Sequence, residues 1–442
     1  GLPSVVFDLQ RPNDLQHGDF SVNAAMRLSK AAKQPPQKLA QRIVEILSSE
    51  TAFFRKVEAV GPGFVNLFLT ENTIQNALKE LTADQRLGIP TSGSGQPVVV
   101  DYSSVNIAKQ MHVGHLRSTI IGDVLARVLE ALGHPVIRQN HLGDWGVPIA
   151  MVIWKTAPIL REIEQRGGDP ASELPLSKME AIYKEAVKDC GENPAHADEC
   201  RKILVALQNG DQAHWKDWQT ITRLSMAEVY RLYLLLNVLL TPEHECGESF
   251  YRDRLAGTVE AIRASGHLQE SQGAQCVFLS QFKTKDGSPL PVIVQKSDGG
   301  FNYETFDLAA VRYRLHELHA SRAIYVVDAR QALHFSQTFA VAETVGWTQK
   351  DGASIPLEHV AFGTVLGEDN KPLKTRSGEN VKLADLLKEA VERAYAAVNG
   401  KNPDLPEERK QRIAEAVGIG AVKYADLSTN RNNDYVFAWD RM

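Results

Sequence analysis

The sequence predicts an α/β protein built on a parallel sheet, with a small α+β domain before it and a helical segment after it. Residues 98–104, "VVVDYSS", and 134–146, "HPVIRQNHLGDWG", each resemble a strand that ends in a turn. Between them, apolar residues recur at helical spacing from Leu116 to Leu132. A strand, a helix and a strand in this order form a βαβ unit, and such a unit requires parallel strands.

The first element in chain order is the small α+β domain, expected at residues 1–90. "FSVNAAMRLSKAAKQPPQKLAQRIVEIL" has helical periodicity that Pro35 and Pro36 interrupt. "KVEAVGPGFVNLFLT" then alternates like two strands around a Gly-Pro-Gly turn. "RLGIPTSGSGQP" is rich in turn formers, and we interpret it as a linker that ends near residue 97.

The parallel-sheet domain is expected at residues 91–379, with a mostly helical insertion at about 151–270. β-type segments resume at "GAQCVFLS", "LPVIVQKS" and "RAIYVVDAR". A helix from about Gln331 follows the last of these and makes another βα step. "EHVAFGTVLG" is predicted as one more strand, and residues 380–442 are expected to be helical almost to their end.

Composition narrows the class of protein. Hydrophobic residues make up 43% of the 442, so a sizeable core can form. The net charge of −5 gives no general attraction to nucleic acid, so an RNA-binding face would have to gather basic residues. No apolar run approaches the ~20 residues of a membrane span, and no secretory leader is visible. Four cysteines without C-x-x-C spacing favour a reducing, cytoplasmic compartment and no zinc site.

The stretch "IAKQMHVGHLRST" at residues 107–119 opens the predicted helix. A helix N-terminus has unpaired N–H groups and the positive end of the helix dipole, so it attracts phosphate. Gly114 lets a ligand approach the backbone, and Lys109 adds a mobile positive charge. His112 and His115 can donate hydrogen bonds to phosphate oxygens. Taken alone, the pattern also fits an ordinary helix cap that faces solvent.

In "VVVDYSSVNIAKQMHVGHLRSTIIGD" and the following "NHLGDWG", the chain resembles class I aminoacyl-tRNA synthetases, and among them closely the arginyl-tRNA synthetases. Further matches, in order, are "HGDFSVNAA", "VGPGFVNLFL", "GGFNYETFDLAAVRYR", "DARQALHF", "FGTVLGEDNKPLKTRSG" and "VGIGAVKYADLSTNRNNDYVF". The resemblance implies a Rossmann-type catalytic domain, on which HVGH holds ATP, and an N-terminal domain that contacts tRNA.

The resemblance also implies an activity. As a ligase, the protein would use ATP, accompanied by Mg²⁺, to convert L-arginine to arginyl-adenylate and then transfer the arginine to tRNA(Arg). We expect a cytoplasmic monomer with no membrane partner. Three alternatives stay open: a paralogue that activates arginine for a non-translational acceptor, a nucleotidyltransferase that works without tRNA, and a catalytically silent arginine sensor.

An arginine pocket is indicated by residues farther along the chain. Tyr303 and Asp307 are four residues apart and share a face if a helix begins near Tyr303. A carboxylate pairs with a guanidinium through two N–H···O bonds. Gln331 follows the strand "AIYVVD", at the carboxyl edge where α/β sheets bind ligands. An Asp on a helix is usually only solvated, but the resemblance implies that Tyr303, Asp307 and Gln331 recognise the arginine side chain.

Four further site positions follow from the resemblance alone. Asp101 and Asn106, which flank "YSSV", match additional arginine contacts. Trp145 and His334 match active-site positions, and we group them with the ATP site.

The second sequence motif of the class I enzymes is degenerate. "KPLKTRSG" occupies its place, with Pro372 and Thr375 where that motif has lysines. Lys374 and Arg376 are the cations that remain, and the resemblance implies that Lys109 takes over the missing charge. On the residues alone, this stretch is an exposed basic turn.

The chain also departs from the family pattern. Val105 stands where a proline is usual, and Pro148 in "GDWGVPIA" stands in a changed turn. The family normally continues past "DYVFAWD" with an all-helical anticodon-binding domain, whereas this sequence stops at Met442. We expect a trimmed piece of a longer chain rather than a natural paralogue.

Overall fold

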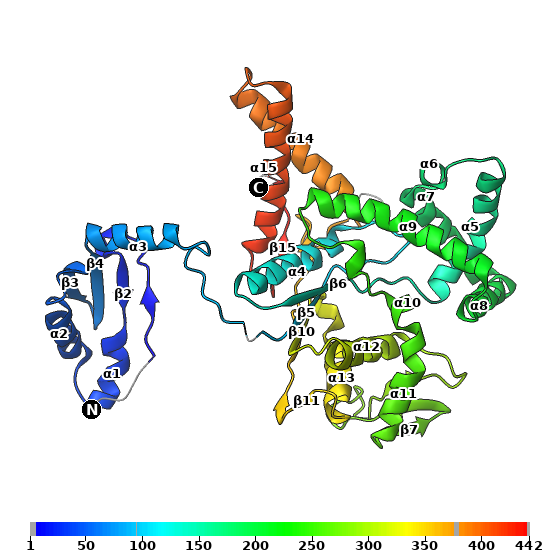
Figure 1. The fold of residues 1–442 in the computed structure, drawn as a ribbon, viewed down its shortest axis with the longest axis horizontal. Helices are drawn as coiled ribbons and strands as arrows, with labels where there is room; N and C mark the ends of the chain where they lie inside the picture. Colours follow the sequence, from blue (N-terminus) through cyan, green and yellow to red (C-terminus); the bar gives the residue numbers. More distant parts are fainter. Residues whose placement is uncertain (1–5, 94, 375–379, 440–442) are drawn as a thin grey trace. The chain divides into compact units, whose positions relative to one another are not determined.

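A computed structural model describes residues 6–93, 95–374 and 380–439 of the chain (Figure 1). The chain forms two compact units, residues 1–91 and 92–442. Across the described residues, none of the helices combines the length and the apolar character that crossing a membrane requires.

The first unit is an antiparallel sheet of order β1-β2-β4-β3, packed against α1 and α2. Its elements are β1 (Leu9–Gln10), η1 (Leu15–His17), β2 (Phe20–Val22), α1 (Ala24–Ala32), α2 (Pro36–Leu47), β3 (Phe54–Val60), β4 (Phe64–Leu69) and α3 (Glu71–Ala83). Pro36 stands in the first turn of α2, where its missing N–H costs no hydrogen bond. Gly63 turns β3 into β4 at φ 136°. The structure confirms the helix break and the hairpin.

The second unit is organised around a four-stranded parallel sheet of order β13-β10-β5-β6. Its strands are β5 (Val98–Asp101), β6 (Val136–Gln139), β10 (Arg322–Tyr325) and β13 (Leu357–His359). Val99 pairs with Ala323 on one side and with Ile137 on the other. β5 is buried along its whole length, which is typical of a parallel strand covered on both faces. The predicted parallel α/β core is confirmed.

Three helices pack around this sheet and position the candidate site. They are α4 (Val113–Ala131), α12 (Tyr303–Arg312) and α13 (Ala332–Thr344), and short turns η4 (Tyr313–Glu317) and η5 (Ala329–Gln331) stand beside the last two. α4 connects β5 to β6, so the βαβ unit exists as predicted. η4 is a π-type turn, a local widening of the helix that is frequent at functional sites.

The insertion is helical, as expected, and a small separate sheet follows it. Its helices are α5 (Val147–Gln165), α6 (Pro170–Glu173), α7 (Leu176–Glu192), α8 (Pro194–Gln208), α9 (Gln212–Leu235), η2 (Pro242–His244), α10 (Glu248–Tyr251), η3 (Arg252–Arg254) and α11 (Leu255–Ala264). The sheet consists of β7 (Leu268–Ser271), β8 (Ala274–Val277) and β9 (Val292–Gln295) and is antiparallel. "GAQCVFLS" and "LPVIVQKS" therefore form strands outside the parallel sheet.

The prediction of one strand over "EHVAFGTVLG" is wrong. The structure divides this segment between β13 and β14 (Val365–Leu366), and β14 pairs with β15 (Tyr435–Val436); β11 (Gln349–Lys350) and β12 (Ala353–Ser354) form a hairpin before it. Gly363 marks the division, because a Cβ there would lie 2.5 Å from the backbone carbon of Asn433. Arg117 donates to the carbonyls of both residues, at 2.8 and 3.0 Å, so the chain leaves the main sheet to close around this side chain.

The last two helices form a hairpin that belongs to the second unit (Figure 1). α14 (Leu383–Lys401) and α15 (Glu407–Leu427) approach closely, since a Cβ on Gly418 would lie 2.7 Å from the carbonyl oxygen of Ala390. Asp426 of α15 accepts a hydrogen bond from the Nε of Arg117 at 2.9 Å, and both side chains are buried. α15 is thereby tied to the start of α4.

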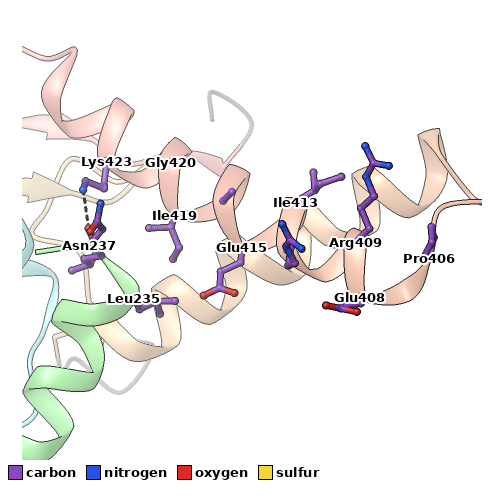
Figure 2. Close-up of a pocket in the computed structure, with 13 residues that line it drawn as sticks. Leu235, Asn237, Pro406, Glu408, Arg409, Ile413, Glu415, Ile419, Gly420 and Lys423 are labelled. Atoms are coloured by element: carbon purple, nitrogen blue, oxygen red, sulfur yellow. Dashed lines mark hydrogen bonds between the residues drawn. The ribbon is translucent and has the colours of Figure 1, made fainter. Parts of the chain in front are cut away.

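A groove of about 1080 Å³ runs along α15 beside the end of α9 (Figure 2). Lys423 of α15 lies beside Asn237 at one end of the groove and donates to the carbonyl of Leu236 at 2.7 Å (Figure 2). Charges of both signs line the groove, including Glu408, Arg409 and Glu415, so it offers no uniform charge to a ligand.

Candidate active site

The candidate site lies at the carboxyl edge of the parallel sheet. β5 ends at Asp101 and leads into the loop before α4. β6 leads into residues 140–146, and β10 leads into residues 326–331. Side chains that follow neighbouring parallel strands meet at this edge, where α/β proteins bind ligands.

The loop between β5 and α4 has an unusual backbone. Ser103, Ser104 and Ala108 all have φ between 49° and 72°, a conformation that costs free energy for residues other than glycine. Hydrogen bonds hold it: the N–H of Ser103 donates to Ser118 Oγ at 2.9 Å, and the N–H of Ala108 donates to Ser225 Oγ of α9 at 2.9 Å. The sheet, α4 and the helical insertion together fix the course of this loop.

His112 and His115 cap α4 reciprocally. The N–H of Gly114 donates to His112 Nδ1 at 3.0 Å, and the N–H of His112 donates to His115 Nδ1 at 3.1 Å. Burial lowers both imidazole pKa values, that of His115 to about 3. Both rings are therefore neutral, and because each Nδ1 accepts a hydrogen bond, each ring carries its proton on Nε2. The two rings, whose centroids are 4.0 Å apart, present N–H donors without a net charge.

Gly114 is required by the cap itself. A Cβ at this position would lie 2.7 Å from Cε1 and 2.9 Å from Nδ1 of His112. A side chain would thus displace the His112 ring, an effect additional to any close approach of a ligand. His112 and Gly114 line a small hollow of about 80 Å³, together with Asp328, Arg330 and others.

Four predicted residues line a second, larger cavity of about 350 Å³. Asn106, Lys109, Trp145 and Tyr303 belong to its wall. The Lys109 ammonium lies 4.7 Å from the ring centroid of Tyr183, a cation–π contact. The loop from Asn106 to Gly114 therefore contributes to both hollows.

Asp307 and Tyr303 come together at His334, as their spacing on a helix predicts. His334 Nε2 lies 2.6 Å from Asp307 Oδ2, and the Tyr303 and His334 ring centroids are 5.0 Å apart. Burial raises the pKa of Asp307, but the His334 hydrogen bond and the nearby His141 outweigh it, so this pKa is lowered. Burial also lowers the pKa of His334, but Asp307 outweighs it and this pKa is raised. His334, grouped with ATP on the sequence, thus lies beside two residues predicted to recognise arginine.

Asp101 is engaged by a side chain that the sequence analysis missed. Arg314 Nη2 donates to Asp101 Oδ2 at 2.8 Å, and the two side chains are only 1% and 7% exposed. The guanidinium also lies 4.6 Å from the Tyr325 ring centroid and donates to Gln139. Arg314 stands in the π-type turn η4, and its Nη1 has no partner among the described residues.

Glu248 is a second residue that the sequence analysis missed. It opens α10 and lines the larger cavity beside Trp145 and Asn106. Burial, reinforced by the negative charges of Asp144 and Asp307, raises the pKa of Glu248 to about 8. The carboxyl is thus poised to ionise when a cation enters. No local motif marks this residue, because α10 is a four-residue helix without periodicity.

The remaining predicted residues lie at the margins. Gln331 is the exposed N-cap of α13. Lys374 is exposed, and its backbone pairs with that of Asn380 in an isolated antiparallel β-bridge. Thr375 and Arg376 lie outside the described residues.

The two departures from the family pattern fit their surroundings. Val105 is buried, and its carbonyl accepts from the N–H of Gly143 at 2.9 Å. Pro148 stands in the first turn of α5, where the missing N–H costs no hydrogen bond, and it lines the larger cavity.

Comparison with known proteins gives matches along almost the whole chain. A family model described as tRNA synthetases class I (R), catalytic domain, matches residues 74–439, and an arginyl tRNA synthetase N-terminal domain model matches residues 3–69. The curated arginine–tRNA ligase of Azotobacter vinelandii is 50% identical over 434 residues, and that of Hahella chejuensis is 46% identical over 442. These alignments cover 98% and 100% of this chain and 73% and 74% of the relatives.

Solved structures agree. An arginyl-tRNA synthetase from Plasmodium falciparum superimposes with a TM-score of 0.76 at 30% identity, covering 99% of this chain and 73% of that one. The Thermus thermophilus arginyl-tRNA synthetase has the same fold, with a TM-score of 0.72 at 22% identity and coverage of 99% and 74%.

A parallel sheet whose first βα turn carries HVGH at the mouth of a helix defines the catalytic core of a class I aminoacyl-tRNA synthetase. Within that class, the chain belongs to the arginyl-tRNA synthetase family. The sequence-based predictions of family and of fold class are both confirmed.

Proposed function

We propose that this chain is an arginine–tRNA ligase, which activates L-arginine with MgATP and transfers it to tRNA(Arg). One observation carries the proposal beyond family membership. A single loop, residues 106–114, supplies both a capped helix N-terminus and part of the wall of a cavity that contains a carboxyl group. Phosphate and a cationic amino acid can therefore be held by adjoining parts of one segment.

At the nucleotide end, we assign the phosphates to the first turn of α4. His112 and His115 offer neutral Nε2–H donors, which can stabilise negative charge as it grows on the phosphates. Lys109 adds a positive charge on a flexible stem and can leave the Tyr183 ring for a phosphate oxygen. We also assign Lys374 and Arg376, from the degenerate second motif, to the phosphates.

At the arginine end, we assign the guanidinium to carboxylates. Asp307 Oδ2 faces His334, while Oδ1 lies 4.0 Å from His141 Nε2, beyond hydrogen-bond distance. Oδ1 is thus placed to accept from a guanidinium, and Glu248 supplies a second carboxyl that ionises as the cation binds. Tyr303 covers this group from the rim, where its side chain is well exposed.

Three further residues are assigned to the same pocket. We assign Gln331 to recognition of the arginine side chain together with Tyr303 and Asp307, and Asn106, which lines the larger cavity, to a further arginine contact. Trp145, grouped with ATP on the sequence, lines the same cavity as Asn106, and we assign it to the apolar wall. Asp101 acts through Arg314, because the buried ion pair already occupies its Oδ2.

The reaction has two steps. In the first, a carboxylate oxygen of arginine attacks the α-phosphorus of ATP, the bond to the bridging oxygen breaks, and pyrophosphate leaves. In the second, a hydroxyl of the terminal ribose of tRNA attacks the arginyl carbonyl, loses its proton, and AMP leaves. The neutral histidines and Lys109 stabilise the charge that passes onto the phosphates in the first step.

We also propose a tRNA-contacting domain, an oligomeric state and a cellular location. We assign the N-terminal domain, predicted at residues 1–90, to contact with tRNA, supported by the match of residues 3–69 to the N-terminal family model. We also propose a location in the cytoplasm, which the sparse cysteines support, and a monomeric state. Light scattering on the purified chain tests the monomer, with a stable dimer as the contradicting result.

The test of the function is arginine-dependent exchange of pyrophosphate into ATP, together with charging of tRNA(Arg). Citrulline is the matched control substrate, because it has the shape of arginine without the charge. We expect kcat/KM for citrulline to be lower by about 10²-fold or more, since the half-buried Asp307 carboxylate would lose the positive charge of its substrate partner. Failure of arginine to support exchange, with or without tRNA(Arg), would contradict the proposal.

A further inference from the structure

A carboxylate from the helical insertion holds the loop that carries Lys109 and His112 through hydrogen bonds. Glu180 of α7 accepts hydrogen bonds from the Nε2 of Gln110 at 2.9 Å and from the N–H of Gln110 at 3.3 Å. Gln110 directly follows Lys109 and stands two residues before His112. Glu180 itself lines neither hollow of the candidate site.

The same carboxylate holds the segment that precedes α14. Lys382 Nζ donates to both oxygens of Glu180, at 2.6 and 2.7 Å, and the two side chains are only 20% and 12% exposed. The backbone around Lys382 is in turn paired with the histidine loop. The N–H of Val113 donates to the Val381 carbonyl at 3.0 Å, and the N–H of Leu383 donates to the Met111 carbonyl at 2.9 Å.

A second side chain of α7 contacts Lys109 directly. Tyr183 stands one helical turn after Glu180, so both side chains emerge from the same face of α7. One face of this helix therefore contacts two successive residues of the loop, Lys109 through the Tyr183 ring and Gln110 through Glu180.

The charges of this junction also bear on His112. Burial raises the pKa of Glu180, but the hydrogen bonds from Lys382 and Gln110 outweigh it, so the pKa is lowered and the group is ionised. Burial lowers the pKa of His112, the charge of Lys382 lowers it further, and Glu180 opposes the second effect. Neutralising Glu180 would leave the positive charge of Lys382 uncompensated beside the histidine cap.

We propose that Glu180 is a positioning residue for ATP: through Gln110 and Lys382 it fixes the loop from which Lys109 and His112 meet the phosphates. The inference rests on the proposed function for the identity of the nucleotide. Glu180 itself touches no substrate. It links the helical insertion to the catalytic loop, so that the position of α7 sets the position of the phosphate-binding groups.

The test is Glu180→Gln, with Glu185→Gln as the matched control. Glu185 lies on the same helix, pairs with Lys155 at 2.8 Å, and is 62% exposed. In charging of tRNA(Arg), we expect Glu180→Gln to lower kcat/KM for ATP by roughly 10- to 100-fold, because a small misplacement of catalytic groups has effects of this size. KM for arginine should change by no more than about twofold, since the substitution leaves the residues that we assign to arginine unchanged.

Lys382→Met and the double variant complete the cycle. Both single changes break the same contact, so the two losses should not add in the double variant. Gln110→Met should reproduce the selective loss for ATP on a smaller scale, and it takes the place of Glu180→Gln if that variant fails to fold. Equal behaviour of Glu180→Gln and Glu185→Gln would overturn the proposal. Equal losses for ATP and arginine would also overturn it, because they would show a general structural role.

Equilibrium dialysis with MgATP alone separates this inference from the proposed function. If the parent chain binds MgATP but does not use arginine, the proposed function fails. The comparison of Glu180→Gln with the parent then still tests whether Glu180 positions the phosphate-binding loop. Weaker MgATP binding by Glu180→Gln, with parent-like binding by Glu185→Gln, supports the inference. Identical MgATP binding by the parent and both variants overturns it.

Discussion

At the nucleotide end of the candidate site, neighbouring residues hold one another, whereas at the arginine end the contacts join distant parts of the chain. His112 and His115 cap each other within one helical turn. Asp307 instead meets His334 from another helix, and Asp101 meets Arg314 across 213 residues of sequence. The nucleotide end therefore depends on local backbone geometry, and the arginine end depends on buried charges that compensate one another.

The largest effect is expected from breaking the buried pair at the arginine end. Arg314→Met leaves the Asp101 carboxylate buried without its partner, and such losses cost about 3–5 kcal/mol of the free energy of unfolding. Urea unfolding of the parent and the variant measures this difference.

Arg322→Met is the control for that prediction. Arg322 of β10 also forms an ion pair, with Glu358, but its side chain is 38% exposed. Its loss should therefore lower the free energy of unfolding by less than about 1 kcal/mol. If Arg322→Met and Arg314→Met destabilise equally, burial of the Arg314 pair has no special importance.

Asp307→Asn should have the next largest effect, this time on substrate use. The change keeps the shape but removes the charge that we assign to the guanidinium, so kcat/KM for arginine should fall by about 10²-fold or more. Asp198→Asn, in an exposed pair with Arg201, is the control. Parent-like arginine kinetics in Asp307→Asn would remove this residue from the pocket.

Lys109→Ala tests the opposite end. We expect the Lys109 charge to stabilise the phosphates mainly in the transition state. Adenylate formation by Lys109→Ala should therefore slow by about tenfold or more, while arginine affinity changes little. Lys188→Ala, at an exposed position of α7, is the control. A change confined to arginine affinity would show that Lys109 does not replace the missing lysine of the second motif.

The smallest expected effect is a pH dependence that belongs to the arginine end alone. The pKa of His334 is raised above its ordinary 6.5. The Asp307–His334 ion pair therefore contributes its full stabilisation of the fold below pH 6.5, and this stabilisation is lost as the pH rises through the raised pKa. Because neutral His334 competes less for Asp307, kcat/KM for arginine should rise over the same interval, by up to about tenfold. His334→Gln should reduce the rise and leave only the part that comes from ionisation of Glu248, whose pKa is raised to about 8; an unchanged profile would contradict the competition.

The same contrast explains what the sequence could predict. The βαβ unit, the start of α4 at HVGH and the shared face of Tyr303 and Asp307 follow from the spacing of residues along the chain, and the structure has all three. Arg314 and Glu248 were missed because only tertiary contacts give them their importance. The strand over "EHVAFGTVLG" was predicted wrongly for the same reason: the segment leaves the sheet where Arg117, distant in sequence, donates a hydrogen bond to the Gly363 carbonyl.

The central claim, that different contacts hold the nucleotide end and the arginine end, is tested most directly by the double variant Lys109→Ala/Asp307→Asn. Their contacts involve different partners, Tyr183 for Lys109 and His334 for Asp307. The measurement is the rate of arginyl-adenylate formation by the parent, both single variants and the double variant under the same conditions. We predict that the two losses in transition-state free energy add to within about 0.5 kcal/mol. A coupling of several times that size would contradict the account and show that the two ends form one interacting unit.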